Sequence, residues 1–175
     1  MRQVARSALW FVLVPVPVSY GVPTALGNWL PDSASASGGW RAFGAVVAAI
    51  GTTALLTCFV DFIRQGFGTP APNEPPRELV VARLYRYSRN PMYLSVLLTI
   101  IGEGIFWASW IIVGYAAVLG FALHGWIVAI EEPQLRKRFG DQYESYRSRV
   151  PRWLGLPRRM ELHCKGMHLS GFARR

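Results

Sequence analysis

Two adjacent carboxylates, Glu131 and Glu132, follow a long apolar run and come directly before Pro133. Carboxylates at the edge of a membrane span are costly unless they are solvated, paired or used for binding. His124 lies seven residues before Glu131, which places both on one face of a helix. The pattern fits a pocket in which Glu131 binds a cationic or hydrogen-bonding group, with His124 deeper inside. It equally fits carboxylates paired with nearby arginines and a histidine satisfied in the core.

A second polar cluster, "YRYSRNPMYLS" (85–95), stands at the start of another apolar run. Pro91 suits the first turn of a helix, where its missing N–H is no loss. The free N–H groups of such a helix start attract an anion such as a carboxylate, and Arg86 and Arg89 add positive charge. Tyrosines 85, 87 and 93 add flat surfaces and hydroxyl groups. The pattern therefore fits a ligand pocket, or else snorkelling arginines and an interfacial aromatic belt.

A third cluster is "GFGTPAP", in which Gly66 and Gly68 follow an apolar run. Two glycines at this spacing allow a backbone to approach a ligand closely. The same residues would also serve as a flexible exit from a membrane helix, and the motif alone does not separate the two.

The elements that position these clusters are apolar. Charged residues make up 17% of the 175 residues, against about 25% in an average soluble domain. Four uncharged or nearly uncharged runs are long enough, or nearly so, to cross a bilayer: Ser7–Leu30, Ala42–Val60, 92–106 and 109–130. We predict an all-α, polytopic membrane protein with four transmembrane helices, or five if the proline-containing first run breaks in two.

The last two runs form a hairpin in this prediction, with "GEGIFWASW" as its turn and Trp107 and Trp110 as interfacial anchors. After the fourth run, apolar residues recur at helical spacing at 135, 139, 143 and 146. This predicts one cytoplasmic amphipathic helix on the membrane surface. We divide the chain into N-terminal spans (1–65), a core (66–153) and a basic tail (154–175).

Charge placement predicts the orientation. Eighteen of the 19 lysines and arginines fall on one side of a four-span topology, and Arg41 alone falls on the other. The positive-inside rule makes the first side cytoplasmic, as in a bacterial inner membrane. The net charge of +9 is then explained by topology and anionic headgroups, which argues against nucleic acid as a partner. The two cysteines, Cys58 and Cys164, show no metal-site spacing, and we expect both to be reduced.

Together these clusters resemble one family. The segment "GFGTPAPNEPPRELVVARLYRYSRNPMYLS", a hairpin, and then "EEPQLRKRFGDQYESYRSRVPRW" are similar to the integral-membrane methyltransferases. That group includes isoprenylcysteine carboxyl methyltransferases and phospholipid N-methyltransferases. The resemblance covers Gly66 to Trp153 and implies S-adenosylmethionine as cofactor and a lipidic or small membrane-partitioned molecule as methyl acceptor.

The resemblance also implies roles for individual residues. Residues of the cofactor site would be Gly66, Gly68, Leu79, Val80, Tyr85, Asn90, Pro91, Met92, Tyr93 and Glu131. Arg89, Glu132 and His124 are the candidate catalytic residues, with Glu132 or His124 as the base if the acceptor is an amine.

Two positions depart from the family pattern. Arg83 stands where the family often has glycine, and we expect the turn to adjust or the loop to move, because arginine disfavours positive φ. Ile127 stands where the prenylcysteine enzymes have a substrate-contacting arginine. We therefore predict a methyltransferase closer to the bacterial members. The alternatives are a nicotinamide-dependent membrane reductase with a similar C-terminal bundle and a non-catalytic scaffold.

Overall fold

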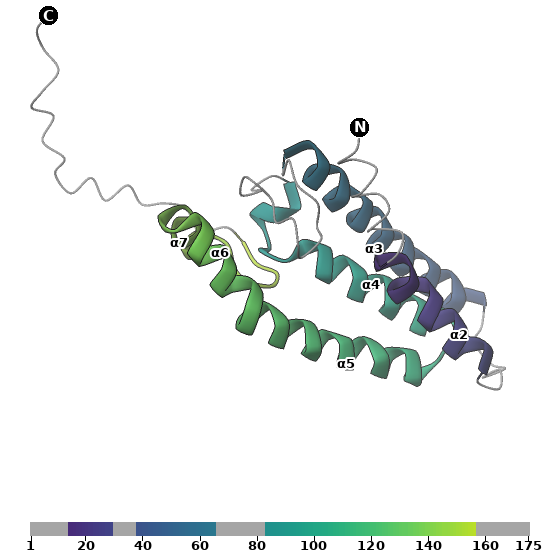
Figure 1. The fold of residues 1–175 in the computed structure, drawn as a ribbon. Coiled ribbons are helices and arrows are strands. Elements are labelled where there is room, and N and C mark those ends of the chain that lie inside the picture. The colour runs from purple at the N-terminus through teal and green to yellow at the C-terminus, as the bar shows by residue number, and fades with distance from the viewer. Residues whose placement is uncertain (1–13, 30–37, 66–82, 157–175) are drawn as a thin grey trace, which may run out of the picture.

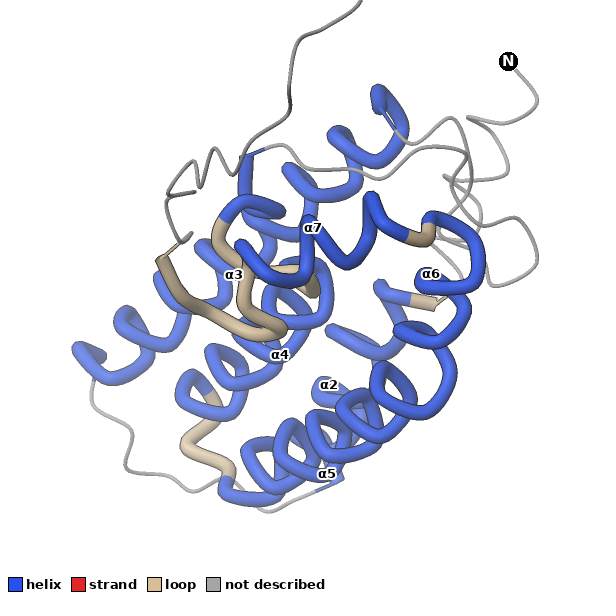
Figure 2. The backbone as a smooth tube through the Cα atoms, turned by 90° about the vertical axis from the view of Figure 1, so that its left-hand side faces the viewer, coloured by secondary structure: helices blue, strands red, loops and turns tan. Residues whose placement is uncertain are grey.

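The structure, a computed structural model, describes residues 14–29, 38–65 and 83–156, and every element in them is helical. The helical turns and helices, in chain order, are η1 (Pro17–Gly21), α2 (Val22–Trp29), α3 (Gly38–Gln65), η2 (Arg83–Arg86), α4 (Pro91–Phe106), α5 (Trp110–Trp126), η3 (Ile127–Glu131), α6 (Glu132–Phe139) and α7 (Asp141–Arg149). Figure 2 shows short loops between the helices from α4 to α7. The predicted all-α class is confirmed for these residues.

Helix α4 is the centre of the bundle and lies between α3 and α5 (Figure 1). It packs most extensively against α3, because glycines on both helices let the backbones approach closely. A Cβ atom added to Gly51 would lie 2.6 Å from the backbone nitrogen of Thr99. Gly44 and Gly102 are equally tight against the facing backbone. The core beside this contact contains Leu55, Val96, Ile100, Ile112 and Ala116.

Two helical stretches are long and apolar enough to cross a membrane, Gly38–Asp61 and Trp110–Phe139. Helix α4 is apolar but shorter. The first predicted run is helical over its described part, from Pro17 to Trp29. Within this run, a π-helical turn begins at Pro17. The total of four or five spans remains a prediction.

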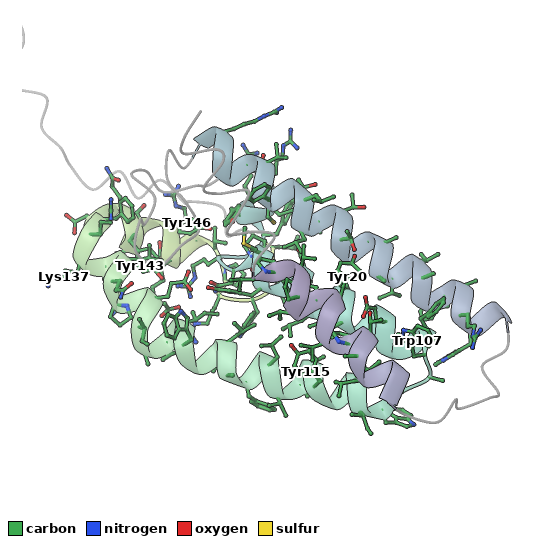
Figure 3. All side chains as sticks on the ribbon, turned by 45° about the vertical axis from the view of Figure 1, so that its right-hand side comes forward. Tyr20, Trp107, Tyr115, Lys137, Tyr143 and Tyr146 are labelled. Atoms are coloured by element: carbon green, nitrogen blue, oxygen red, sulfur yellow. The ribbon has the colours of Figure 1, made fainter. Side chains whose placement is uncertain are left out.

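The predicted hairpin turn lies between α4 and α5. Helix α4 ends at Phe106, and the Ser109 side chain caps α5 by accepting a hydrogen bond from the Ile112 amide. Trp110 is 86% exposed, as an interfacial anchor should be. Trp107 instead packs against Gly27 of α2. Figure 3 shows Trp107 at the end of the bundle opposite Tyr143 and Tyr146.

The fourth run is longer than predicted, because α5, η3 and α6 continue as one helical stretch to Phe139. The π-helical turn η3 ends two residues before Pro133, whose ring and missing N–H would otherwise break a regular helix. Gly140, with φ of +48°, then separates α6 from α7. The structure therefore has two short helices where we predicted one, although Leu135 and Phe139 still pack with Tyr143 and Tyr146.

Candidate functional site

Three segments far apart in the sequence meet at one end of the bundle: the start of α4, the end of η3 with the start of α6, and α7 with the loop after it. Several of the buried or half-buried side chains there are polar, in contrast to the apolar helices that hold them. Tyr143 and Tyr146 point from α7 toward this junction (Figure 3).

Glu132 is the centre of an ion-pair network. Arg89 donates from Nη1 to Glu132 Oε1 at 3.0 Å. Arg152 donates from Nε to Oε1 at 2.7 Å and from Nη2 to Oε2 at 3.0 Å. The Glu132 side chain is 8% exposed and that of Arg89 is 9% exposed. Since both carboxylate oxygens accept from arginines, Glu132 ties α6 to the start of α4 and to the C-terminal loop.

Arg89 also donates from Nη1 to the Tyr143 hydroxyl at 3.0 Å. Its Nε is buried and has no hydrogen-bond partner among the described residues. An unpaired buried donor is costly. Arg89 therefore presents one N–H that an added acceptor, such as a ligand carboxylate, would satisfy.

Glu131 has a different environment from its neighbour. It is half-buried, and the Tyr93 hydroxyl donates to its Oε2 at 3.0 Å. No arginine pairs with Glu131 among the ion pairs of the described residues. The two adjacent glutamates thus differ in kind: Glu132 pairs with two arginines, and Glu131 accepts a hydrogen bond from Tyr93 and pairs with no arginine of the described residues.

The loop that follows α7 folds back over the start of α4 (Figure 2). The Arg89 amide donates to Pro151 O, and Gly155 N donates to Tyr87 O, both at 3.0 Å. The Asn90 amide group donates to Arg152 O at 3.0 Å. Because its side chain is used in this way, Asn90 does not cap α4, and no side chain of the described residues caps the first-turn amides of α4.

Tyr85 lies in the same cluster. Its carbonyl accepts a hydrogen bond from the Tyr146 hydroxyl at 2.8 Å. Burial raises the pKa of the Tyr85 phenol well above its usual value, and the acidic groups of Cys58, Tyr146, Glu131 and Tyr93 add to the shift when they are ionised.

Other predicted site residues lie at varying distances from this junction. Pro91 is buried at the first position of α4, and Met92 packs against the apolar core. His124 is exposed on α5, and its ring stacks on Trp153 with 5.9 Å between ring centroids. Residues Gly66, Gly68, Leu79 and Val80 lie outside the described residues.

Sequence reasoning did not single out Arg152, Tyr143 or Ser88 as site residues. The Ser88 hydroxyl accepts a hydrogen bond from the backbone N–H of Asn90 at 3.0 Å and donates one to Arg152 O at 3.3 Å. Arg152 does lie within the segment "RSRVPRW" on which the family resemblance partly rests. No local pattern pairs it with a glutamate 20 residues earlier, because the contact depends on the turn at Gly140 and on the loop after α7.

A family model described as phospholipid methyltransferase matches residues 40–142, which is more than half of the chain. The match covers α3, α4, α5 and the segment with both glutamates, and Arg152 lies just beyond it. No curated protein and no solved structure matches the chain. The match confirms the resemblance predicted from the sequence: the chain belongs to the phospholipid methyltransferase family, a family of membrane methyltransferases.

Proposed function

We propose that this protein transfers a methyl group from S-adenosylmethionine to a lipidic or small membrane-partitioned acceptor. The main support is that Glu131 and Arg89 each have bonding capacity left for a ligand, whereas both carboxylate oxygens of Glu132 already accept from arginines. Among the described residues, one carboxylate without an arginine partner and one guanidinium N–H without an acceptor lie at the same junction. This pair complements a zwitterionic amino-acid group, which has one ammonium and one carboxylate.

The residues present fit the cofactor as follows. Glu131 would bind the ammonium of its amino-acid end, with Tyr93 holding the carboxylate in place. Arg89 Nε, together with the uncapped first-turn amides of α4, would bind the carboxylate of the cofactor's amino-acid end. When bound, the cofactor supplies an electrophilic methyl group, whose bond to sulfur breaks as the bond to the acceptor forms.

Glu132 has a positioning role in this proposal and is not the base. Its carboxylate already accepts three hydrogen bonds from two arginines, so it is poorly placed to take a proton from an acceptor. By holding Arg89 and Arg152, it fixes the start of α4 against the C-terminal loop. His124 stacks on Trp153 of that loop, which suggests a positioning role as well.

We further propose that this end of the bundle faces the cytoplasm. Among the described residues, lysines and arginines gather on η2, α6, α7 and the loop after α7, whereas Arg41 lies over the Phe106 ring at the opposite end. A cofactor made in the cytoplasm would enter from water, while an acceptor dissolved in the bilayer would enter between the helices.

The test is methyl transfer by the full-length protein in liposomes, with S-adenosylmethionine labelled in its methyl group. Label should enter the lipid-extractable fraction with the wild type. Glu131→Gln should lower the rate about 10-fold to 100-fold, the equivalent of one lost charged hydrogen bond. Glu144→Gln is the matched control, because Glu144 is an exposed carboxylate on α7. Equal rates in all three proteins would refute the proposed site.

A further inference from the structure

Four buried side-chain atoms have no hydrogen-bond partner among the described residues: Ser19 Oγ, Asp61 Oδ2, Arg89 Nε and Glu103 Oε2. Arg89 belongs to the candidate functional site. The other three atoms are oxygens outside that site, and a buried oxygen without a partner calls for a cation or a hydrogen-bond donor.

Asp61 already has a cation beside it. Its side chain is 2% exposed, and Arg83 Nε lies 3.5 Å from its Oδ1. Arg83 reaches it with a φ of +45°, in the left-handed region that favours glycine. We expected the turn to adjust to this arginine, and instead the arginine adopts the glycine-like conformation. The charge of Asp61 is thus compensated by another residue of the chain.

Glu103 has no such partner. It is 9% exposed, and it is the one Asp, Glu, Lys or Arg between Met92 and Ile130. None of the ion pairs of the described residues includes it. Arg41 lies over the nearby Phe106 ring instead, 5.8 Å from the ring centroid. Acidic residues inside apolar membrane helices are costly and rare, and they mark ion or substrate sites.

Contacts at two levels fix how η1 and α2 lie along α4. A Cβ atom added to Gly27 would lie 3.6 Å from the ring of Trp107, at the end of α4. The Tyr20 hydroxyl hydrogen-bonds to Thr52 of α3, and the residue before Thr52 packs on Thr99. Both contacts relate positions about 80 apart in the sequence. Therefore η1 and α2 run parallel to α4, and each of their residues is level with the α4 residue about 80 positions later.

Ser19 and Glu103 lie on facing surfaces of this helix contact. Glu103 is level with Pro23, and Ser19 is level with Thr99, one turn away. Ser19 and Pro23 are fully buried and, being four residues apart, share one face of their helical stretch. Side chains of a helix lean toward its N-terminus, so the Glu103 carboxylate leans toward the level of Ser19. Two oxygens without partners therefore lie within about one helical turn of each other.

Further oxygens lie at the same level. Pro23 has no N–H, so a carbonyl one turn earlier lacks its helical donor. The Val18 carbonyl, in the π-helical turn η1, accepts a hydrogen bond from the Tyr115 hydroxyl at 3.3 Å (Figure 3). Carbonyl and hydroxyl oxygens keep a lone pair after one such bond. The contact between η1 and α4 thus offers carboxylate, hydroxyl and carbonyl oxygens.

We propose that this contact binds one sodium ion between η1 and α4. Glu103 Oε2 and Ser19 Oγ are its main ligands, and Val18 O and the Tyr115 hydroxyl supply further oxygens. Oxygen ligands suit hard cations, and a single carboxylate balances a single positive charge. Backbone carbonyls freed at an irregular turn of a membrane helix bind sodium ions in the same way.

The place of this site in the bundle determines how the ion would enter. Glu103 lies within one turn of Phe106, at which α4 ends. The ion would therefore enter from the end of the bundle opposite the candidate functional site. Its binding holds η1 against α4 and does not rest on the proposed function.

The experiment is thermal unfolding of the full-length protein in dodecyl maltoside, followed by tryptophan fluorescence. Sodium chloride is raised from about 1 mM to about 100 mM, while N-methylglucamine chloride keeps the ionic strength constant; a site with a Kd of about 1 mM should then raise the wild-type Tm by about 5–10 °C. Glu103→Gln should abolish the rise, and Ser19→Ala should shift the response to about tenfold higher sodium. Glu144→Gln, which changes an exposed carboxylate on α7, is the matched control and should respond as the wild type does.

A wild-type Tm that is equal at both sodium concentrations would overturn the proposal and assign a proton to Glu103. A sodium response retained by Glu103→Gln would remove the carboxylate from the site, and an unchanged response of Ser19→Ala would remove the serine. Because each response is a difference within one protein, a lower basal stability of a variant does not mask it. Should Glu103→Gln fail to fold, the shifted response of Ser19→Ala still tests the site.

Discussion

The two adjacent glutamates should respond differently to the same substitution, one mainly in stability and the other mainly in ligand binding. Glu132→Gln removes the charge that neutralises the buried Arg89. Glu131→Gln removes a charge with no arginine partner among the described residues, and a glutamine at position 131 still offers Tyr93 a carbonyl oxygen. We therefore expect Glu132→Gln to destabilise the fold and Glu131→Gln to affect mainly ligand binding.

The magnitude follows from burial. Breaking a buried ion pair costs about 3–5 kcal/mol, because the remaining charge is left uncompensated. Arg152 is 29% exposed and recovers part of its solvation, so the lower figure, about 3 kcal/mol, applies to Glu132→Gln. Exchanging the charged acceptor of the Tyr93 hydrogen bond for a neutral one costs about 1 kcal/mol.

The assay is reversible unfolding in mixed micelles of dodecyl maltoside and sodium dodecyl sulfate, which yields the free energy of unfolding directly. Glu132→Gln should lose about 3 kcal/mol and Glu131→Gln about 1 kcal/mol, as estimated for a buried ion pair and a hydrogen bond. Equal losses would refute the division of roles between the two glutamates, and so would a larger loss for Glu131→Gln.

Three further substitutions test the packing, the strained turn and the tyrosine cluster. Gly51→Ala should lower the free energy of unfolding by about 1–3 kcal/mol, because the added Cβ would overlap the α4 backbone. Gly114→Ala is the control and should not lower it, because position 114 has open space around it. Equal effects of the two substitutions would contradict the close contact between α3 and α4. Arg83→Gly should lose about 2 kcal/mol, the net of relieved strain and an unpaired buried carboxylate; adding Asp61→Asn should restore the wild-type value, and failure to do so would exclude the pair as the cause. Burial raises the pKa of Tyr146 above its usual value. The contribution of Tyr146 to the free energy of unfolding is therefore fully present below the unfolded-state pKa near 10, and it is lost as the pH rises further, at about 1.4 kcal/mol per pH unit. Tyr146→Phe should make that alkaline loss shallower, and an unchanged pH profile would contradict the assignment.

Features that depend on local sequence could be predicted. The α4–α5 hairpin, the helix start at Pro91 and the apolar run of α3 follow from hydrophobicity, proline and turn residues near one another in the chain. The chemical character of the site could also be predicted, because Tyr93, Arg89 and the two glutamates stand at the ends of apolar runs, where charged residues are costly unless they are solvated, paired or used for binding.

Features that depend on contacts between distant segments could not. Whether Glu131 or Glu132 pairs with an arginine depends on the fold of the loop after α7, which brings Arg152 back to α6. The division of the C-terminal helix depends on Gly140, a residue that a helix tolerates at only modest cost. Asp61 stood at the end of an apolar run without a visible partner, and its pairing with Arg83 depends on a left-handed backbone that arginine seldom adopts.

The most direct test of the central claim is calorimetry of S-adenosylhomocysteine binding to the full-length protein in detergent, beside Glu131→Gln and Glu144→Gln. The account predicts binding by the wild type and Glu144→Gln, and affinity weakened about 10-fold to 100-fold in Glu131→Gln, as for one lost charged hydrogen bond. Absence of binding by the folded wild type, or equal binding by Glu131→Gln, would contradict it.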